Sequence, residues 1–172
     1  LGALVSLGTA PSIASVGFLL HVGFRQAAWS IGIEARGDVP GSAADGDGRI
    51  YAGLAAGWLV PCLHFPVRPM GARMLEAAGC ALVGGGVHYG GAEGMVENYT
   101  VGAPYVAGGL RAALEVPVGK RFAFVVQGDV IVPIYNLRAL QLKNLSDTVR
   151  RTDWEAPAVT GAFSAMLLYY FR

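Results

Sequence analysis

Charged residues are scarce in this chain, and neither sign is in excess. Of 172 residues, 13 are lysine or arginine and 12 are aspartate or glutamate, so 15% of the chain is charged. Soluble domains carry about 25%. The balanced charge gives no reason to expect nucleic acid as a partner. The mean hydropathy of +0.46 favours a membrane protein instead.

Histidine is also scarce, which limits the chemistry that the chain can perform. The three histidines, His21, His64 and His88, are not at the short spacings of metal ligands. Ser15 and His21 share one face of a predicted strand, but they are about 20 Å apart at strand rise, too far for direct proton transfer. We therefore predict no cofactor, no metal site and no enzymatic activity.

Helical membrane spans are missing as well. Two uncharged stretches, 1–24 and 50–67, are long enough to cross a membrane as helices. Several glycines and Pro11 interrupt the first, and Pro61 and Pro66 interrupt the second. Glycine and proline are poor occupants of helix interiors. These two uncharged stretches are therefore expected to form another kind of secondary structure than a membrane-spanning helix.

The sequence has instead a hydrophobic period of two. Even positions between 14 and 24 are apolar, whereas the odd ones are mostly small or polar. Alternate positions again form one apolar and one polar set in residues 27–38, 103–117 and 120–135. Only in the terminal segment, 158–172, does one of the two sets mix apolar and polar residues. A strand places alternate residues on opposite faces. The pattern therefore predicts strands with one apolar face and one polar face.

This pattern predicts an all-β protein with eight strands. They lie at about 1–8, 13–25, 27–37, 49–63, 72–89, 103–117, 120–135 and 158–172. Short turns near Arg25–Gln26 and in 66–71 and 116–121 alternate with long connections in 36–49, 89–103 and 136–156. Short and long connections are therefore expected at opposite ends of a closed, antiparallel, up-and-down β-barrel that forms a single domain over 1–172.

The end of the chain carries the most specific resemblance to a known family. Ser164, Tyr169 and Phe171 take the polar, hydrophobic and aromatic places of the terminal assembly signal of outer-membrane barrels, although Met166 stands where glycine is expected and Arg172 follows the aromatic. Over nearly its whole length the chain resembles the small eight-stranded barrels of the outer membrane protein A and X type. The resemblance implies a transmembrane barrel in the outer membrane of a Gram-negative bacterium, with the assembly machinery as a partner.

Charged and polar residues occupy the alternate strand positions that would face the interior of this barrel. Isolated buried charges are very costly, so these side chains must pair with one another. We predict a network centred on Arg111 with Glu34, Glu115 and Asp129. The full set is His21, Arg25, Glu34, Arg36, Glu76, His88, Arg111, Glu115, Gln127 and Asp129. A plug that fills the interior is favoured over a gate or a proton path.

Two cysteines, Cys62 and Cys80, lie at about equal distances from a turn at Met70–Gly71. In a hairpin of that register they face each other, and an oxidising periplasm would allow a disulfide. The sequence leaves open whether they are bonded. It also leaves open which face of the fourth strand, with Trp58, is turned inward.

Aromatic and basic residues suggest contacts outside the barrel. Aromatic girdles at the two membrane interfaces are predicted near the strand ends, formed by Trp29, Tyr89, Tyr105, Phe122, Tyr135, Tyr169 and Phe171. Basic residues of the last long connection would meet lipopolysaccharide phosphates. They are Arg138, Lys143, Arg150 and Arg151. The lipid bilayer and lipopolysaccharide are therefore the predicted partners.

The sequence as a whole predicts a monomeric, non-enzymatic, integral outer-membrane β-barrel with a structural or surface-interaction role. Two alternatives stay open. One is a soluble, lipocalin-like barrel that binds an apolar ligand inside, with its charged set outside. The other is a narrow, porin-like channel. A lipid-modifying barrel enzyme is a third hypothesis, for which no catalytic set can be assembled from the sequence.

Overall fold

The computed structural model describes residues 1–45, 48–70, 73–93, 99–135, 140–142, 151–154 and 157–171. The strands in these ranges are β1 (Gly2–Leu7), β2 (Ala14–Gln26), β3 (Trp29–Asp38), β4 (Gly41–Asp45), β5 (Gly48–Met70), β6 (Arg73–Glu93), β7 (Tyr99–Pro117), β8 (Phe122–Tyr135), β9 (Leu140–Leu142), β10 (Arg151–Trp154) and β11 (Thr160–Tyr169). Across these ranges no helix has the length and apolar character to cross a membrane.

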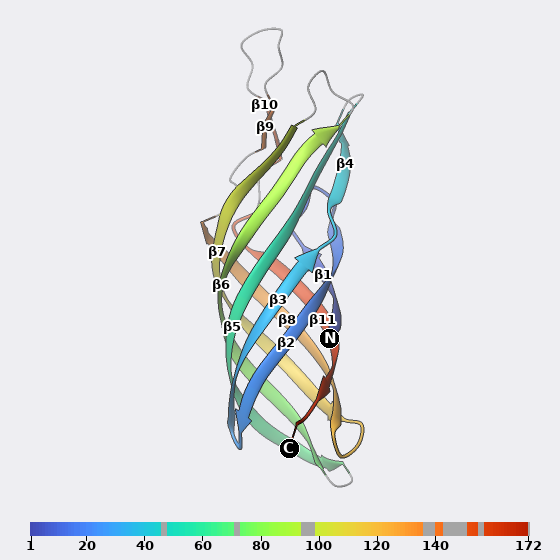
Figure 1. Ribbon diagram of the computed structural model, residues 1–172, viewed down its shortest axis with the longest axis vertical. Helices are drawn as coiled ribbons and strands as arrows, with labels where there is room; N and C mark the ends of the chain where they lie inside the picture. Colours follow the sequence, from blue (N-terminus) through green and yellow to red (C-terminus); the bar gives the residue numbers. More distant parts are fainter. Residues whose placement is uncertain are drawn as a thin grey trace.

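Eight strands form a closed, hydrogen-bonded ring. The order around the ring is β3-β2-β1-β11-β8-β7-β6-β5, and pairing of β5 with β3 closes it. Every pair is antiparallel. The predicted all-β ring of eight antiparallel strands is therefore confirmed, and it resembles a barrel (Figure 1). We call its lower end in Figure 1, where β2 turns into β3 and β7 into β8, the short-turn end, and the opposite end the long-loop end.

The connections differ in detail from the predicted ones. The turn expected at Arg25–Gln26 lies two residues later, at Ala27 and Ala28, where Ala27 has a positive φ of 40°. The short turn expected over 66–71 begins later than predicted, because β5 continues to Met70 through a register shift after Pro66, and Met70 pairs with Arg73 of β6. An irregularity of this kind tolerates proline, which cannot donate a ladder hydrogen bond.

Strands also occupy much of the predicted long connections. In 36–49, β4 pairs with β5 as a ninth strand of the sheet. In 89–103, β6 and β7 continue to pair as far as Ala92 and Tyr99. In 136–156, β9 and β10 form a separate two-stranded sheet. The long-loop end is therefore built partly of strands that extend beyond the ring.

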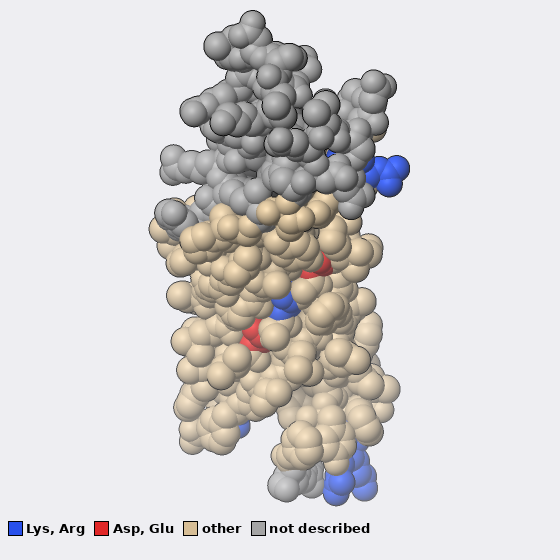
Figure 2. Space-filling model, turned by 45° about the horizontal axis from the view of Figure 1, so that its top comes forward, with Lys and Arg blue, Asp and Glu red and all other residues tan. Residues whose placement is uncertain are grey.

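The outer face of the ring is apolar. Phe18, Val22, Ile33, Leu110 and Phe163 are each about 60–70% exposed. On the face drawn in Figure 2, lysine and arginine lie mainly near the two ends, and few charged atoms are visible in the middle. This is the side that alternation assigned to the apolar set.

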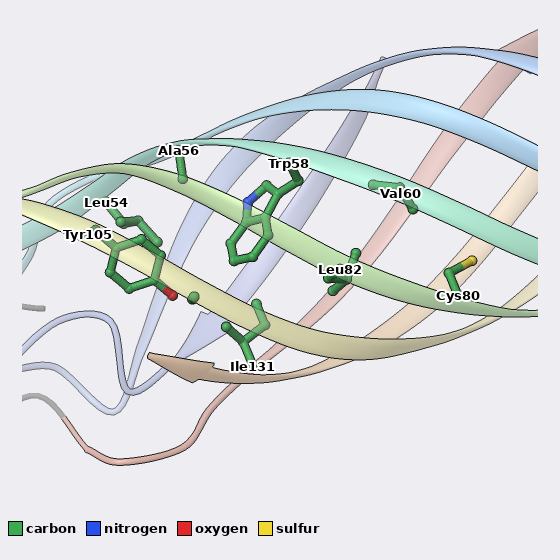
Figure 3. Close-up of a cluster of buried hydrophobic side chains, with 9 residues drawn as sticks. Leu54, Ala56, Trp58, Val60, Cys80, Leu82, Tyr105 and Ile131 are labelled. Atoms are coloured by element: carbon green, nitrogen blue, oxygen red, sulfur yellow. The ribbon is translucent and has the colours of Figure 1, made fainter. Parts of the chain in front are cut away.

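The inner face carries both apolar and charged residues. One apolar cluster has members on β5, β6, β7 and β8, among them Trp58, Leu82, Tyr105 and Ile131 (Figure 3). The facing of the fourth predicted strand, which the sequence left open, is now clear, since Trp58 and Leu54 are buried inside. Charged side chains occupy the remaining interior.

Candidate functional site

A cluster of buried charges lies in the centre of the ring, with Arg111 of β7 at its middle. Arg111 donates two hydrogen bonds of 2.8 Å to Glu34 of β3, and bonds of 2.7 and 2.9 Å to Asp129 of β8. All three residues are at least nine-tenths buried. His21 Nδ1 lies 3.7 Å from Glu34 Oε2. We call Arg111, Glu34, Asp129, His21 and Gln127 the central cluster.

Gln127 completes this cluster from β8. With its amide oriented so that the oxygen faces donors, the oxygen accepts hydrogen bonds from Ser164 Oγ (2.9 Å) and Arg111 Nη1 (3.1 Å). Ser164, predicted as part of the assembly signal, is therefore buried inside the ring. The central cluster has members on β2, β3, β7 and β8, and β3 is not a neighbour of β7 or β8 in the sheet.

A second group, the short-turn cluster, surrounds Arg25 near the short-turn end. Arg25 forms ion pairs with Glu76 and with Glu115, the second at 2.8 Å. Arg73 lies 3.4 Å from Glu115, and its guanidinium stacks 4.4 Å from the centre of the Tyr170 ring. Glu115, which was predicted to lie at the centre of the network, therefore belongs to this separate group.

Tyr170 binds the short-turn cluster from the end of the chain. It follows β11, and its hydroxyl donates a 2.5 Å hydrogen bond to Glu115. Burial, followed by this contact with Glu115, raises the pKa of Tyr170. The phenol therefore stays protonated and keeps its role as a donor.

Three side chains of the short-turn cluster have metal-ligand atoms close to one another. The ligand atoms of His64, Glu76 and Glu115 lie within 4.8 Å of one another. Arg25 already forms ion pairs with both carboxylates, and His64 also shares a 2.8 Å hydrogen bond with Ser30. The arrangement thus balances its charge with its own arginine.

The third group, the long-loop cluster, lies near the long-loop end. Arg36 is 3.2 Å from Asp38 and donates a 2.5 Å hydrogen bond to Ser6. His88 Nε2 lies 2.9 Å from the carbonyl oxygen of Thr9, in the segment between β1 and β2. Arg36 and His88, which were predicted to belong to a single interior network, therefore belong to the long-loop cluster.

Cys62 and Cys80 are joined by a disulfide between β5 and β6. They are directly paired in the register of these strands, with Cα atoms 4.0 Å apart. Cys80 also pairs in register with Arg111 on β7. The covalent link therefore lies beside the central cluster.

The remaining predicted residues lie at the ends of the ring, inside it, or outside the described ranges. Tyr169 and Phe171 are exposed at the short-turn end, with ring centres 4.8 Å apart. Tyr105 does not belong to an aromatic girdle, because it is buried inside against Trp58. Arg138, Lys143, Arg150 and Arg172 lie outside the described residues, as do the side chains of Tyr135 and Arg151.

Sequence reasoning missed several interior polar residues, namely Ser6, Ser30, His64, Arg73 and Tyr170. Tyr170 lies at an even position of the terminal segment, as do Ser164 and Met166, which are both buried. The even positions mix apolar and polar residues, so alternation alone did not identify them as the interior face. His64 shares parity with Trp58, and its placement required the facing of that strand.

The protein-family models, the curated proteins and the solved structures were each compared with this chain, and none matches it.

Proposed function

We propose that the protein is an integral β-barrel of the bacterial outer membrane, with a structural or surface-interaction role. The observation that carries the proposal is the inversion of the two faces. Leu110, Val22 and Ile33 are about 70% exposed on the outer face, whereas Glu34 and Arg111 are no more than 5% exposed inside. Large contiguous apolar surfaces on a soluble monomer are rare. A closed ring also satisfies strand hydrogen bonds within hydrocarbon.

The polar clusters support a filled interior rather than an open pore. Arg25, Arg111 and Arg36 each pair with carboxylates at a different level of the ring. An eight-stranded barrel has an interior just wide enough for its side chains. We therefore expect the pairs to fix strand positions and to block rapid flow of solutes, in contrast to the channel alternative.

The lipocalin-like alternative receives less support. It requires an apolar interior and a charged exterior. The interior does contain an apolar cluster around Trp58 and Leu82, but this cluster packs against itself and leaves the outer apolar residues unexplained. Contact with lipopolysaccharide through Arg138 and its neighbours stays a prediction.

Fractionation and conductance test the proposal together. The full chain, expressed in a Gram-negative host, should sediment with outer membranes and require detergent for extraction. It should migrate differently on gels before and after heating, and show no large conductance in planar bilayers. Recovery in the soluble fraction without detergent would favour the lipocalin-like alternative. A large, stable conductance would favour the channel.

A further inference from the structure

Three neighbouring strands bring metal-ligand groups together in the short-turn cluster. His64 lies on β5, Glu76 on β6 and Glu115 on β7, and one ligand atom of each lies within 4.8 Å of the other two. Ligand atoms around a bound zinc ion are about 3–4 Å apart, since each bond is about 2.0–2.2 Å long. A small side-chain movement would therefore give the three groups the geometry of a metal site. Their wide separation in the chain explains why no short ligand motif is visible in the sequence.

The sheet holds the two carboxylates of this group against each other. Glu76 and Glu115 are directly paired in the register of β6 and β7. Like charges directly opposite each other on neighbouring strands are destabilising, so a positive charge is required between them. Arg25 supplies it, because its guanidinium contacts Oε2 of both glutamates. This is also the place where a cation shared by the two carboxylates would lie.

The imidazole of His64 has a role that the arginine does not explain. Its Nε2 shares a 2.8 Å hydrogen bond with Ser30 Oγ. Its Nδ1 is buried, lies 3.7 Å from Glu76 Oε2, and has no hydrogen-bond partner among the described residues. Buried polar atoms are normally paired. When Nε2 donates to Ser30, Nδ1 directs a lone pair toward the carboxylates, and a cation between them would satisfy both.

The surroundings of these groups resemble the outer shell of a metal site. A histidine that binds a metal usually donates its other ring N–H to an oxygen atom, which fixes the ring. Ser30 offers such an oxygen to His64. Glu115 is held in a similar way through Oε1, which accepts a 2.5 Å hydrogen bond from Tyr170 and lies 3.4 Å from Arg73. Its Oε2 is therefore left to face the shared position.

The disulfide holds two of the three ligand strands in place. It joins Cys62 of β5 to Cys80 of β6. His64 is two residues beyond Cys62, and Glu76 is four residues before Cys80. Ligands carried by rigid, supported strands keep a metal site in its geometry. The cross-link thus fixes the spacing of His64 and Glu76, and it keeps both sulfur atoms out of the ligand set.

We propose that His64, Glu76 and Glu115 form a zinc site, in which the ion takes the place of the Arg25 guanidinium. Imidazole suits zinc and similar transition metals, whereas calcium and magnesium take oxygen ligands. Zinc sites with three protein ligands complete their coordination with water. β6 begins at Arg73, at the short-turn end (Figure 1). The site therefore lies near the end of the ring, where the interior meets the solution.

Zinc titration of the full chain in detergent micelles tests the site. The oxidised protein, without an affinity tag and freed of metal by a chelator, should bind one zinc ion in calorimetry, and calcium or magnesium should not displace it. Zinc should shift the NMR signals of the His64 ring nitrogens and leave those of His21 unchanged. His21 is the matched control, because its Nδ1 also lies 3.7 Å from a carboxylate, that of Glu34, but outside the site.

Four variants should change zinc affinity in different ways. His64→Gln should weaken it by more than about 100-fold, since loss of an outer hydrogen bond alone costs about 10–100-fold. Ser30→Ala removes such an outer bond and should weaken it by about tenfold. Arg25→Gln should strengthen it by about tenfold or more, because zinc no longer competes with the guanidinium, and zinc should stabilise this variant more than the wild type. His21→Gln should bind zinc as the wild type does.

The proposal fails if the wild type binds no zinc at millimolar concentration, or if zinc leaves the His64 signals unchanged. It also fails if His64→Gln binds as tightly as the wild type, if Arg25→Gln binds no more tightly, or if calcium displaces the zinc. The His64 signals are measured on the wild type, so the test does not depend on the folding of a variant. Zinc binding uses interior side chains alone, so its failure would leave the proposed function standing.

Discussion

Arg111 and Glu34 form a two-pronged ion pair across the interior of the ring, with both hydrogen bonds at 2.8 Å. They are 77 residues apart in the chain, on strands β7 and β3 that are not neighbours. Asp129, on β8, pairs in register with Arg111 and binds it from the other side. A planar guanidinium matches two carboxylates in this way. The pair therefore ties together parts of the ring that backbone hydrogen bonds do not connect.

Arg111→Met should be strongly destabilising. It would leave Glu34 and Asp129 buried without their counter-charge, and removal of one partner of a buried pair typically costs about 3–5 kcal/mol. Unfolding by denaturant in micelles would measure the loss. Arg121→Met is the matched control, because Arg121 is exposed and its hydrogen bond to Tyr169 is on the surface. Similar losses for the two variants would contradict a structural role for the central cluster.

The sequence predicts the ring well because each strand has two different faces. Where charge separates cleanly from apolar residues, as in β3 and β8, alternation places Glu34 and Asp129 inside, and both are buried. The fourth predicted strand is ambiguous for a physical reason, since an apolar cluster around Trp58 shares the interior with the charges. His64 could not be placed without that knowledge.

The division of the polar residues into three clusters could not be predicted either. Parity shows that Glu115 and Arg111 share a face, but the level of each residue depends on the register between strands. In the structure Glu115 pairs with Glu76, four residues from the pairing of Arg111 with Cys80. The turn at Ala27 was misplaced because neither Ala27 nor Ala28 is a residue type that marks a turn.

Removal of the disulfide should lower stability without opening the ring. Cys62 and Cys80 are separated by 18 residues, and a cross-link that closes a loop of this length contributes about 3 kcal/mol by restricting the unfolded chain. The double variant Cys62→Ser, Cys80→Ser should therefore unfold at lower denaturant concentration. Reductant should shift the wild type by a similar amount and leave the variant unchanged. An effect of reductant on the variant would assign the shift to another cause.

Two glycines of β6 should respond oppositely to alanine. A Cβ at Gly86 would clash with the carbonyl oxygen of Ala55 and lie 2.6 Å from the Cα of Ala56, whereas a Cβ at Gly79 would meet nothing within 4 Å. Gly86→Ala should cost about 1–3 kcal/mol through overpacking. Gly79→Ala should be neutral or slightly stabilising, because alanine loses less backbone freedom on folding. Thermal unfolding of both variants would check the contrast, and equal midpoints would contradict the close approach of β5 and β6.

A charge on the outer face distinguishes lipid from water as its surroundings. Leu110 is 70% exposed in the middle part of β7, and Val118 is 64% exposed in the turn after it. In water, Leu110→Arg would change stability by less than about 0.5 kcal/mol, as exposed substitutions usually do. In a bilayer the same change should cost about 2–4 kcal/mol near the midplane, whereas Val118→Arg, near the interface, should cost about 0–1 kcal/mol. Unfolding of both variants in liposomes measures the difference. If both variants are equally stable, the apolar outer face does not lie in hydrocarbon.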